Sequence, residues 1–133
     1  MVLKDVLGLL TGEGSMRKSG LVERMCAYNK AISDPNRMKM IKILGSHPVD
    51  SLTVSDVAAI LGISQPAATK HLQVLYAVDL VRRKRVGTSV FYSLDEEALA
   101  DYHRQLDYAF AHAHTPCPYG FKCETCPNME TCM

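Results

Sequence analysis

Four of the five cysteines of this chain lie in its last 17 residues. They follow the pattern C-x5-C-x2-C-x5-C, with the two central cysteines three positions apart. A C-x2-C pair can place two thiolates on one metal ion, and two flanking cysteines complete a tetrahedral site of four sulfurs. Thiolates favour zinc or another thiophilic metal ion, and the same four sulfurs could hold an iron–sulfur cluster. The candidate ligands are Cys117, Cys123, Cys126 and Cys132.

Two short helices joined by a sharp turn are expected near the middle of the chain. Thr53 or Ser55 can cap the first helix, and Gly62 then permits a backbone turn that other residues adopt only at a cost. Ser64 can cap the second helix, whose first turn accommodates Pro66 because an N–H has no helical partner there. This order is typical of a helix-turn-helix, in which the second helix enters the major groove of DNA.

The second helix of this pair has an apolar and a polar side on a 100° helical wheel. On the polar side, Lys70 is suited to a phosphate, whereas the glutamine and threonine side chains can reach base edges. His71 falls near the apolar side and is expected to be buried with its hydrogen bonds satisfied. An ordinary solvated helix face is the alternative interpretation of the polar side. The residues expected to meet DNA are Ser64, Gln65, Thr69, Lys70 and Gln73.

A basic β-hairpin is expected directly after the second helix. Residues 81–86 and 89–92 have the composition of two strands around a turn that contains Gly87. Successive side chains of a strand point to opposite faces, so at least two of the four consecutive cations must reach solvent. A charged edge strand that discourages aggregation is one interpretation, and a wing that grips phosphates is the one we favour. The residues of this wing that are expected to contact DNA are Arg82, Arg83, Lys84, Arg85 and Thr88.

The 133 residues are enough for one domain with a single core. Helices are expected at residues 21–33, 36–44 and 95–113, with Met38, Ile41 and Leu44 on the buried side of the second. No apolar run approaches the roughly 20 residues of a membrane span and no signal-peptide pattern is present, so a cytoplasmic protein without a membrane partner is expected. We also expect no enzymatic activity, because the sequence offers no nucleophile–base pair and no phosphate-binding glycine loop.

The formal net charge of +1 hides a polarity along the chain. Residues 1–94 hold 13 Lys and Arg against 7 Asp and Glu, a balance of +6, whereas residues 95–133 hold 2 against 7, a balance of −5. The basic part should face DNA, and the acidic part should face away from it or towards cations.

These segments resemble the ArsR/SmtB family of metal-responsive repressors. The matching pieces are residues 31–37 (AISDPNR), residues 63–72 (ISQPAATKHL) and the hairpin from Leu80 to Leu94, and the resemblance covers roughly residues 20–114. It implies an α+β fold, mainly α with a small β-hairpin: a winged helix-turn-helix homodimer joined through its first and last helices. It also implies a repressor that binds operator DNA without metal and releases it when an inducer arrives.

The resemblance further implies a metal site between the last helices of two subunits, with Asp101, His103 and His114 among its ligands. On the expected helix the two histidines lie about 16 Å apart along the axis but only about 20° apart around it. One chain therefore cannot close a site with both, whereas two antiparallel helices can. The fourth ligand would be Cys117 in place of the Glu or His of the family, and Cys117 cannot readily serve this site and the tail site at once. Two features fit less well: Asp101 points to a different face from His103, and Pro116 interrupts the helix.

We therefore expect a flexible segment at residues 1–18, a winged helix-turn-helix domain for DNA binding and dimerisation at 19–114, and a Cys-rich metal-binding tail at 115–133. The expected function is that of a homodimeric repressor that releases double-stranded operator DNA on binding a metal ion or a thiol-reactive inducer. Two alternatives stay open. The tail could carry an iron–sulfur cluster or dithiol switch that senses redox state, or it could hold only structural zinc.

Overall fold

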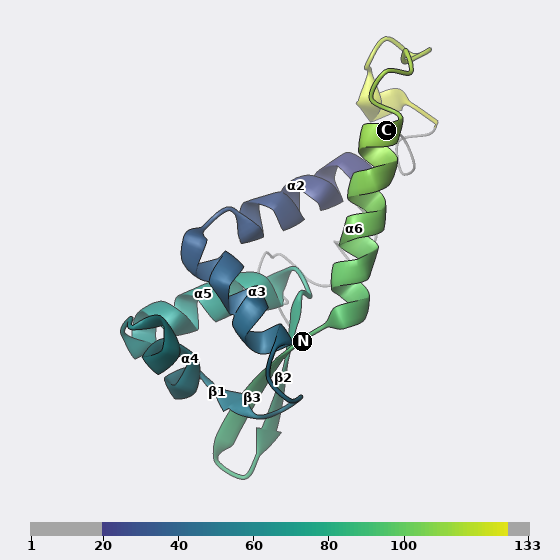
Figure 1. Ribbon diagram of the computed structural model, residues 1–133. Helices are drawn as coiled ribbons and strands as arrows, with labels where there is room; N and C mark the ends of the chain where they lie inside the picture. The colour runs from purple at the N-terminus through teal and green to yellow at the C-terminus, as the bar shows by residue number, and fades with distance from the viewer. Residues whose placement is uncertain (1–19, 128–133) are drawn as a thin grey trace.

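The computed structural model describes residues 20–127. Helices lie beside a small antiparallel sheet (Figure 1), which is the expected α+β class. Every helix within residues 20–127 is too short or too polar to cross a membrane. The segment 1–18, expected to be flexible, lies outside the described residues. In chain order the elements are α2 (Leu21–Ile32), α3 (Pro35–Gly45), β1 (Leu52–Thr53), α4 (Val54–Leu61), α5 (Gln65–Ala77), β2 (Val81–Val86), β3 (Ser89–Leu94), α6 (Glu96–Ala111) and a 3-10 turn (Cys123–Thr125).

The sheet consists of three antiparallel strands in the order β1-β3-β2. β2 and β3 form the expected hairpin, with Val81 opposite Leu94 at its base and Val86 opposite Ser89 at its tip. Gly87 adopts a left-handed φ of 63° in the turn between them. The short strand β1 is an addition that the sequence pattern did not predict, because it pairs with a strand far along the chain. The wing is thereby anchored to the segment that precedes α4.

The core lies where α3, α4 and α5 meet the sheet. Gly45 ends α3 as expected, and a Cβ built there would lie only 3.1 Å from Cδ2 of Leu94. The absence of a side chain therefore lets α3 pack closely against β3. The largest fully buried side chains are Met40, Leu72, Leu75, Leu80, Val57 and Val81.

The expected buried side of α3 was wrong in one residue. Met38 is 51% exposed, whereas Met40 is completely buried and Leu44 is nearly so. Positions i and i+4 share one face of a helix, so Met40 and Leu44 point into the core together. Met38 precedes Met40 by two positions, about 200° around the helix, and points away.

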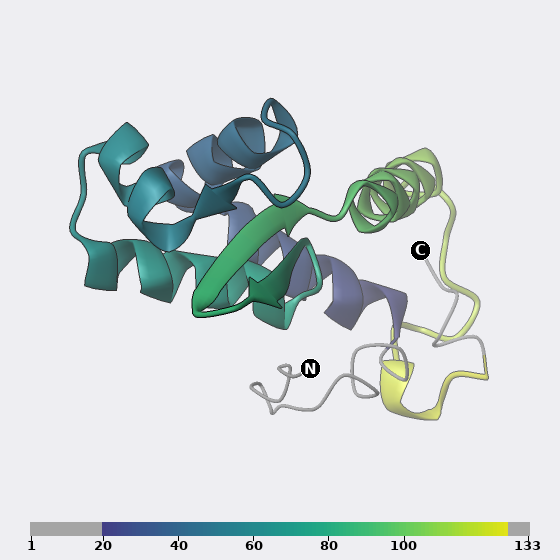
Figure 2. The same cartoon turned by 90° about the horizontal axis from the view of Figure 1, so that it is seen from below.

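α2 and α6 lie side by side at one end of the molecule (Figures 1 and 2). Leu21 and Met25 of α2 form a second buried cluster with Ala109 of α6. The ring centroids of Tyr28 and Tyr102 are 5.2 Å apart. Burial is the main cause that raises the pKa of Tyr28 to about 12, and nearby aspartate carboxylates add to this effect. The C-terminal end of α6 lies at the opposite end of the molecule from the tip of the β2–β3 hairpin (Figure 1). The basic wing and the Cys-rich tail are thus well separated.

Candidate DNA-binding surface and metal-binding tail

Both helices of the helix-turn-helix are capped by side chains that the sequence indicated. The Thr53 hydroxyl accepts the N–H of Asp56 at 3.3 Å, and the Asp56 carboxylate accepts the N–H of Thr53 at 2.9 Å, completing a capping box. The N–H and the hydroxyl of Thr53 both donate to the Asp56 carboxylate, and these two hydrogen bonds lower the pKa of the Asp56 carboxyl. Gly62 ends α4 with a left-handed φ of 71°, and the Ser64 hydroxyl accepts the N–H of Ala67 at 3.2 Å. The angle between α4 and α5 is therefore fixed locally.

Replacing Gly62 with alanine should lower the free energy of unfolding by about 1–2 kcal/mol, because a Cβ disfavours the left-handed conformation. Apart from the neighbouring backbone, no described atom lies within 4 Å of the position that the Cβ would take, so backbone strain alone should account for the loss. Thermal or urea unfolding measures it. Gly62→Asn is the matched control, since asparagine tolerates this conformation better. An equal loss in both variants would contradict the conformational explanation.

α5 presents its expected polar side to solvent. On the opposite side Ala68, Leu72 and Leu75 are buried in the core, which fixes the rotation of the helix about its axis. Thr69 is half-buried at the boundary between the two sides. The expected DNA contacts of this helix and its cap that are exposed are Ser64, Gln65, Lys70 and Gln73.

Gln65, the first residue of α5, is oriented by a residue of α4. The Ser55 hydroxyl donates to Oε1 of Gln65 at 3.1 Å. With its oxygen engaged, the Gln65 amide offers the two N–H donors of its nitrogen to a ligand. Two donors suit a phosphate or the N7 and O6 atoms of guanine, whereas bidentate recognition of adenine requires one donor and one acceptor.

The wing presents different partners on its two faces. All four cations of β2 are exposed. On one face the Arg83 guanidinium lies 4.3 Å from the centroid of the Tyr76 ring of α5, an arrangement that favours a cation over an aromatic face. On the other face Nζ of Lys84 lies 3.7 Å from Oδ2 of Asp50, whose Oδ1 accepts the Ser93 hydroxyl at 3.0 Å.

The alternation of a strand divides the four cations into two pairs. Arg83 and Arg85 share the face that meets α5, while Arg82 shares the face of Lys84, which Asp50 approaches. Thr88, in the hairpin turn, is exposed. A phosphate would have to compete with the Asp50 carboxylate for Lys84. The pair on the α5 face is therefore better placed to contact the same duplex as α5.

The expected metal ligands of α6 are not brought together within one chain. The two carboxylate oxygens of Asp101 accept hydrogen bonds from Arg104 at 3.2 Å and from Gln105 at 2.9 Å. His103 is exposed. Among the described side chains of residues 20–127 in one chain, no three from His, Cys, Asp or Glu come close enough to hold an ion. A site shared between two subunits stays a prediction.

The position of His114 differs from the expectation. α6 ends at Ala111, not near residue 113, and the N–H of Ala113 bonds to the carbonyl of Phe110 at 3.3 Å in a tighter turn. The ring of His112 takes part in this ending, since its Nδ1 lies 2.8 Å from the carbonyl oxygen of Tyr108. His114 follows beyond the helix and is exposed. His114 therefore lies outside the helix on which its angular relation to His103 was calculated.

Cys117 sits in a turn whose backbone favours a thiolate. The N–H of Phe121 donates to its sulfur at 3.4 Å, and hydrogen bonds from the backbone of Phe121, Tyr119 and Gly120 lower the pKa of the thiol. Both Gly120 and Phe121 have a left-handed φ, of 65° and 62°, which turns their N–H groups towards one side. Because the thiolate is the form that binds metal, this turn fits a soft metal ion.

The other tail cysteines are described in part. Cys123 begins the 3-10 turn, and Cys126 follows directly after it and is half-buried. Cys132 lies outside the described residues. The ligand set of four cysteines stays a prediction.

Comparisons with known proteins bear on the winged helix-turn-helix. Residues 32–84 match a helix-turn-helix domain family. The chain is 30% identical over 84 residues to a transcriptional repressor SmtB homologue of Synechocystis sp., covering 63% of this chain and 61% of that relative, less than two thirds of its length. It is 35% identical over 72 residues to the transcriptional repressor SdpR of Bacillus subtilis, covering 54% of this chain and 77% of SdpR. The chain belongs to the ArsR/SmtB family.

Solved structures agree with this membership of the ArsR/SmtB family. An ArsR-like transcriptional regulator from Rhodococcus sp. RHA1 is 27% identical with a TM-score of 0.61, covering 69% of this chain and 84% of that one. A homodimeric winged helix-turn-helix domain from Mycobacterium bovis is 23% identical with a TM-score of 0.55, covering 72% and 85%, and supports the fold alone. The winged helix-turn-helix fold is confirmed. The family consists of transcriptional regulators and not of enzymes.

Sequence reasoning missed the residues that support the candidate DNA contacts. Ser55 was considered only as a cap, yet it orients Gln65. Asp50, with a left-handed φ of 57°, and Tyr76 each hold a cation of the wing. These partners lie 7 to 34 positions from the residues they support, too far for a local pattern. No signal in the sequence pointed towards them.

Proposed function

We propose that this ArsR/SmtB protein is a repressor that binds operator DNA as a homodimer and releases it when a thiophilic metal ion or thiol-reactive inducer binds. The observation that carries the DNA-binding part is the polar side of α5 beside a wing with four exposed cations. α5 would supply base contacts through Gln65, Thr69 and Gln73 and a phosphate contact through Lys70. The wing would supply further phosphate contacts, chiefly through Arg83 and Arg85.

α2 and α6 are the proposed dimer interface. Val22 of α2 and Tyr108 and Phe110 of α6 are exposed by 39%, 43% and 68%. Such apolar side chains on two packed helices favour burial against a second copy. A homodimer is also the state of the related domain from Mycobacterium bovis. A two-fold axis through this interface would present two α5 helices to an inverted repeat.

The proposed inducer site is the tail, for three reasons. The turn at Cys117 already favours a thiolate, whereas both oxygens of Asp101 are engaged and His114 lies beyond the end of α6. Cys117, Cys123, Cys126 and Cys132 would hold a soft ion. Because the tail continues α6, an ion bound there can favour a different arrangement of the two α6 helices in the dimer. The ion lowers DNA affinity only as far as it binds the arrangement that releases DNA more tightly than the arrangement that holds DNA.

The direct test combines composition with release. The protein, purified without oxygen, is analysed for metal, sulfide and visible absorption, and its affinity for a duplex selected from a random-sequence library is then measured with and without added zinc or cadmium ions. A colourless protein that loses affinity on addition of metal supports the proposal. Iron, sulfide and a brown colour would favour the redox alternative. Bound zinc with no effect on affinity would leave the tail a structural element.

Ser55→Ala should relax base preference at the position that Gln65 contacts. Without the Ser55 hydroxyl, the amide of Gln65 can rotate and offer its oxygen, so adenine becomes acceptable where guanine was preferred. We expect the affinity ratio between guanine and adenine duplexes to fall by about fivefold, the loss of one modest hydrogen bond. Competition binding with single-base variants of the selected duplex measures it. Ser51→Ala, which removes an exposed hydroxyl bonded to Pro48, is the control and should leave the ratio unchanged.

A further inference from the structure

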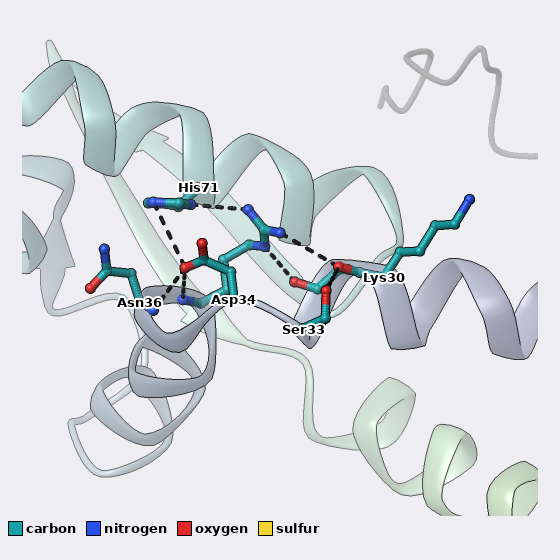
Figure 3. A network of polar contacts seen from close by, with 7 residues as sticks. Lys30, Ser33, Asp34, Asn36 and His71 are labelled. Atoms are coloured by element: carbon teal, nitrogen blue, oxygen red, sulfur yellow. Dashed lines mark hydrogen bonds and ion pairs between the residues drawn. The ribbon is translucent and has the colours of Figure 1, made fainter.

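A network of polar contacts joins α2, α3 and α5 (Figure 3). The Arg37 side chain of α3 is its centre. Nε of Arg37 donates to the carbonyl of Ala31 at 2.5 Å, and Nη2 donates to the carbonyl of Lys30 at 3.5 Å. Nη1 lies 3.1 Å from Nδ1 of His71 on α5. One guanidinium therefore bridges the last turn of α2 and helix α5, the proposed recognition helix.

The chemistry of the contact fixes the state of His71. A guanidinium only donates hydrogen bonds, so Nδ1 of His71 must accept from Arg37 and the imidazole proton lies on Nε2. Nε2 in turn faces Oδ1 of Asp34 at 4.0 Å. The His71 side chain is 20% exposed, so it is partly buried and not wholly enclosed in the core, and its ring nitrogens face polar partners as expected. The ring is held from both sides in one orientation.

The contact to His71 is not needed to complete the helix ends around it. Asp34 caps α3 by itself, accepting the N–H groups of Asn36 at 2.8 Å and Arg37 at 3.3 Å. Partial burial raises the pKa of Asp34, but the backbone hydrogen bonds from Arg37 and Asn36 and the positive charge of the nearby Arg37 guanidinium outweigh it and lower the pKa overall. The carbonyls at the C-terminal end of α2 carry a partial negative charge that Arg37 offsets from α3. The Asp34 carboxylate thus caps α3 without His71, and His71 is an additional partner of it.

Because His71 lies among the proposed DNA contacts of α5, the contact between Arg37 and His71 affects the position of those residues. His71 directly follows Lys70, and Thr69 and Gln73 lie two positions to either side of it. These three residues are proposed DNA contacts, so whatever fixes His71 also fixes their distance from α2. α2 in turn belongs to the proposed dimer interface. The rigid planar fork of Arg37 is suited to holding such a distance, which a flexible lysine would not do.

We propose that Arg37 and His71 are positioning residues that hold the recognition helix at a set distance from the dimer helix α2. This rests on the proposed function, in which a homodimer binds an inverted repeat. In that dimer the bridge occurs twice, once in each subunit, and it sets the separation of the two α5 helices. It thereby selects the spacing of the two half-sites on DNA.

The experiment compares half-site spacings. A duplex is selected from a random-sequence library with the unchanged protein, and versions with one base pair added or removed between its half-sites are prepared. Affinities for these duplexes and for an unrelated duplex are measured with His71→Ala, His71→Asn, His71→Gln and Arg37→Lys. Asparagine carries an oxygen near the position of Nδ1 and can still accept from Arg37, whereas glutamine places its polar atoms one bond farther out. Thermal unfolding of each variant is measured in parallel.

We expect His71→Ala, His71→Gln and Arg37→Lys to lose about tenfold in discrimination between the selected and the re-spaced duplexes, the worth of one hydrogen bond to a charged group. His71→Asn should retain most of it. Affinity for the unrelated duplex should not change, since no phosphate contact is removed. A purely structural role would instead lower the unfolding temperature and weaken binding to all duplexes alike.

Full discrimination in His71→Ala would overturn the proposal. If that variant does not fold, the asparagine and glutamine variants decide, and equal behaviour of the two at similar unfolding temperatures also overturns it. Failure of the proposed function is recognised separately. In that case the unchanged protein selects no duplex, or selects one without two half-sites, and the positioning role falls with it.

Discussion

Replacing Arg83 and Arg85 together with alanine is expected to lower the affinity for the selected operator duplex by roughly 30- to 900-fold, since each of the two charge-assisted contacts with a phosphate contributes about 1–2 kcal/mol. Both side chains are exposed on the face of β2 that meets α5. The loss should be accompanied by a shallower dependence of affinity on salt, by about 0.9 in the logarithmic slope for each phosphate contact removed. Fluorescence anisotropy over a series of salt concentrations measures both quantities.

The matched control removes the same charge from the opposite face of the same strand. In Arg82→Ala with Lys84→Ala the loss should be several-fold smaller, because Asp50 already engages Lys84 and competes with a phosphate for it. Arg104→Ala, on α6, should leave DNA affinity unchanged. Equal losses from the two pairs would mean that the wing acts only through its total charge, and the assignment of one face to DNA would be wrong.

The features predicted from the sequence are those that local chemistry determines. Thr53 and Ser64 cap α4 and α5, and Gly62 takes the left-handed turn between them, because caps and turns depend on residues within a few positions. The alternation of the wing and the buried side of α5 follow from periodicity in the same way. The order of these elements was specific enough to indicate the family.

The features that were missed depend on contacts between distant segments. Asp50 meets Ser93 across 43 positions, and Arg37 meets His71 across 34. No periodicity or motif predicts such a pair, since each of these residues is of a type that is common in turns or on helix surfaces. The prediction of which side of α3 is buried was wrong in one residue for a related reason. Met38 and Met40 are equally apolar, and only the packing of the whole domain decides which of them is buried.

The end of α6 shows how a small local error changes a functional interpretation. The sequence placed the end of the helix near residue 113, yet the backbone tightens after Ala111. Two residues of error are common at helix ends. Here they remove His114 from the helix face that it was expected to share with His103. The candidate metal site shared between two α6 helices loses its geometric support, while the turn at Cys117 gains some.

Substitutions in the tail, which distinguish a metal site there from one between two α6 helices, are expected to have the largest effect on metal-driven release of DNA. In Cys126→Ser, and equally in Cys123→Ser, metal-driven release of DNA should be abolished while metal-free affinity is unchanged. A serine hydroxyl is a poor ligand for a soft ion, so the tail would lose one of its four proposed ligands. In the unchanged protein, binding of the metal ion should lower DNA affinity by about 5- to 150-fold, the usual range of coupling between two ligands. Titration of the protein–DNA complex with zinc or cadmium ions measures it.

Two further variants separate the tail from the other candidate ligands. Cys26→Ser removes an exposed cysteine of α2 and should release DNA normally, which controls for loss of a thiol as such. His103→Ala should also release DNA normally, because His103 is not among the proposed tail ligands. If His103→Ala abolishes release and Cys126→Ser retains it, the inducer binds between the α6 helices after all. Asp101 would then have to give up its hydrogen bonds to Arg104 and Gln105 to become a ligand, and metal affinity would carry that cost.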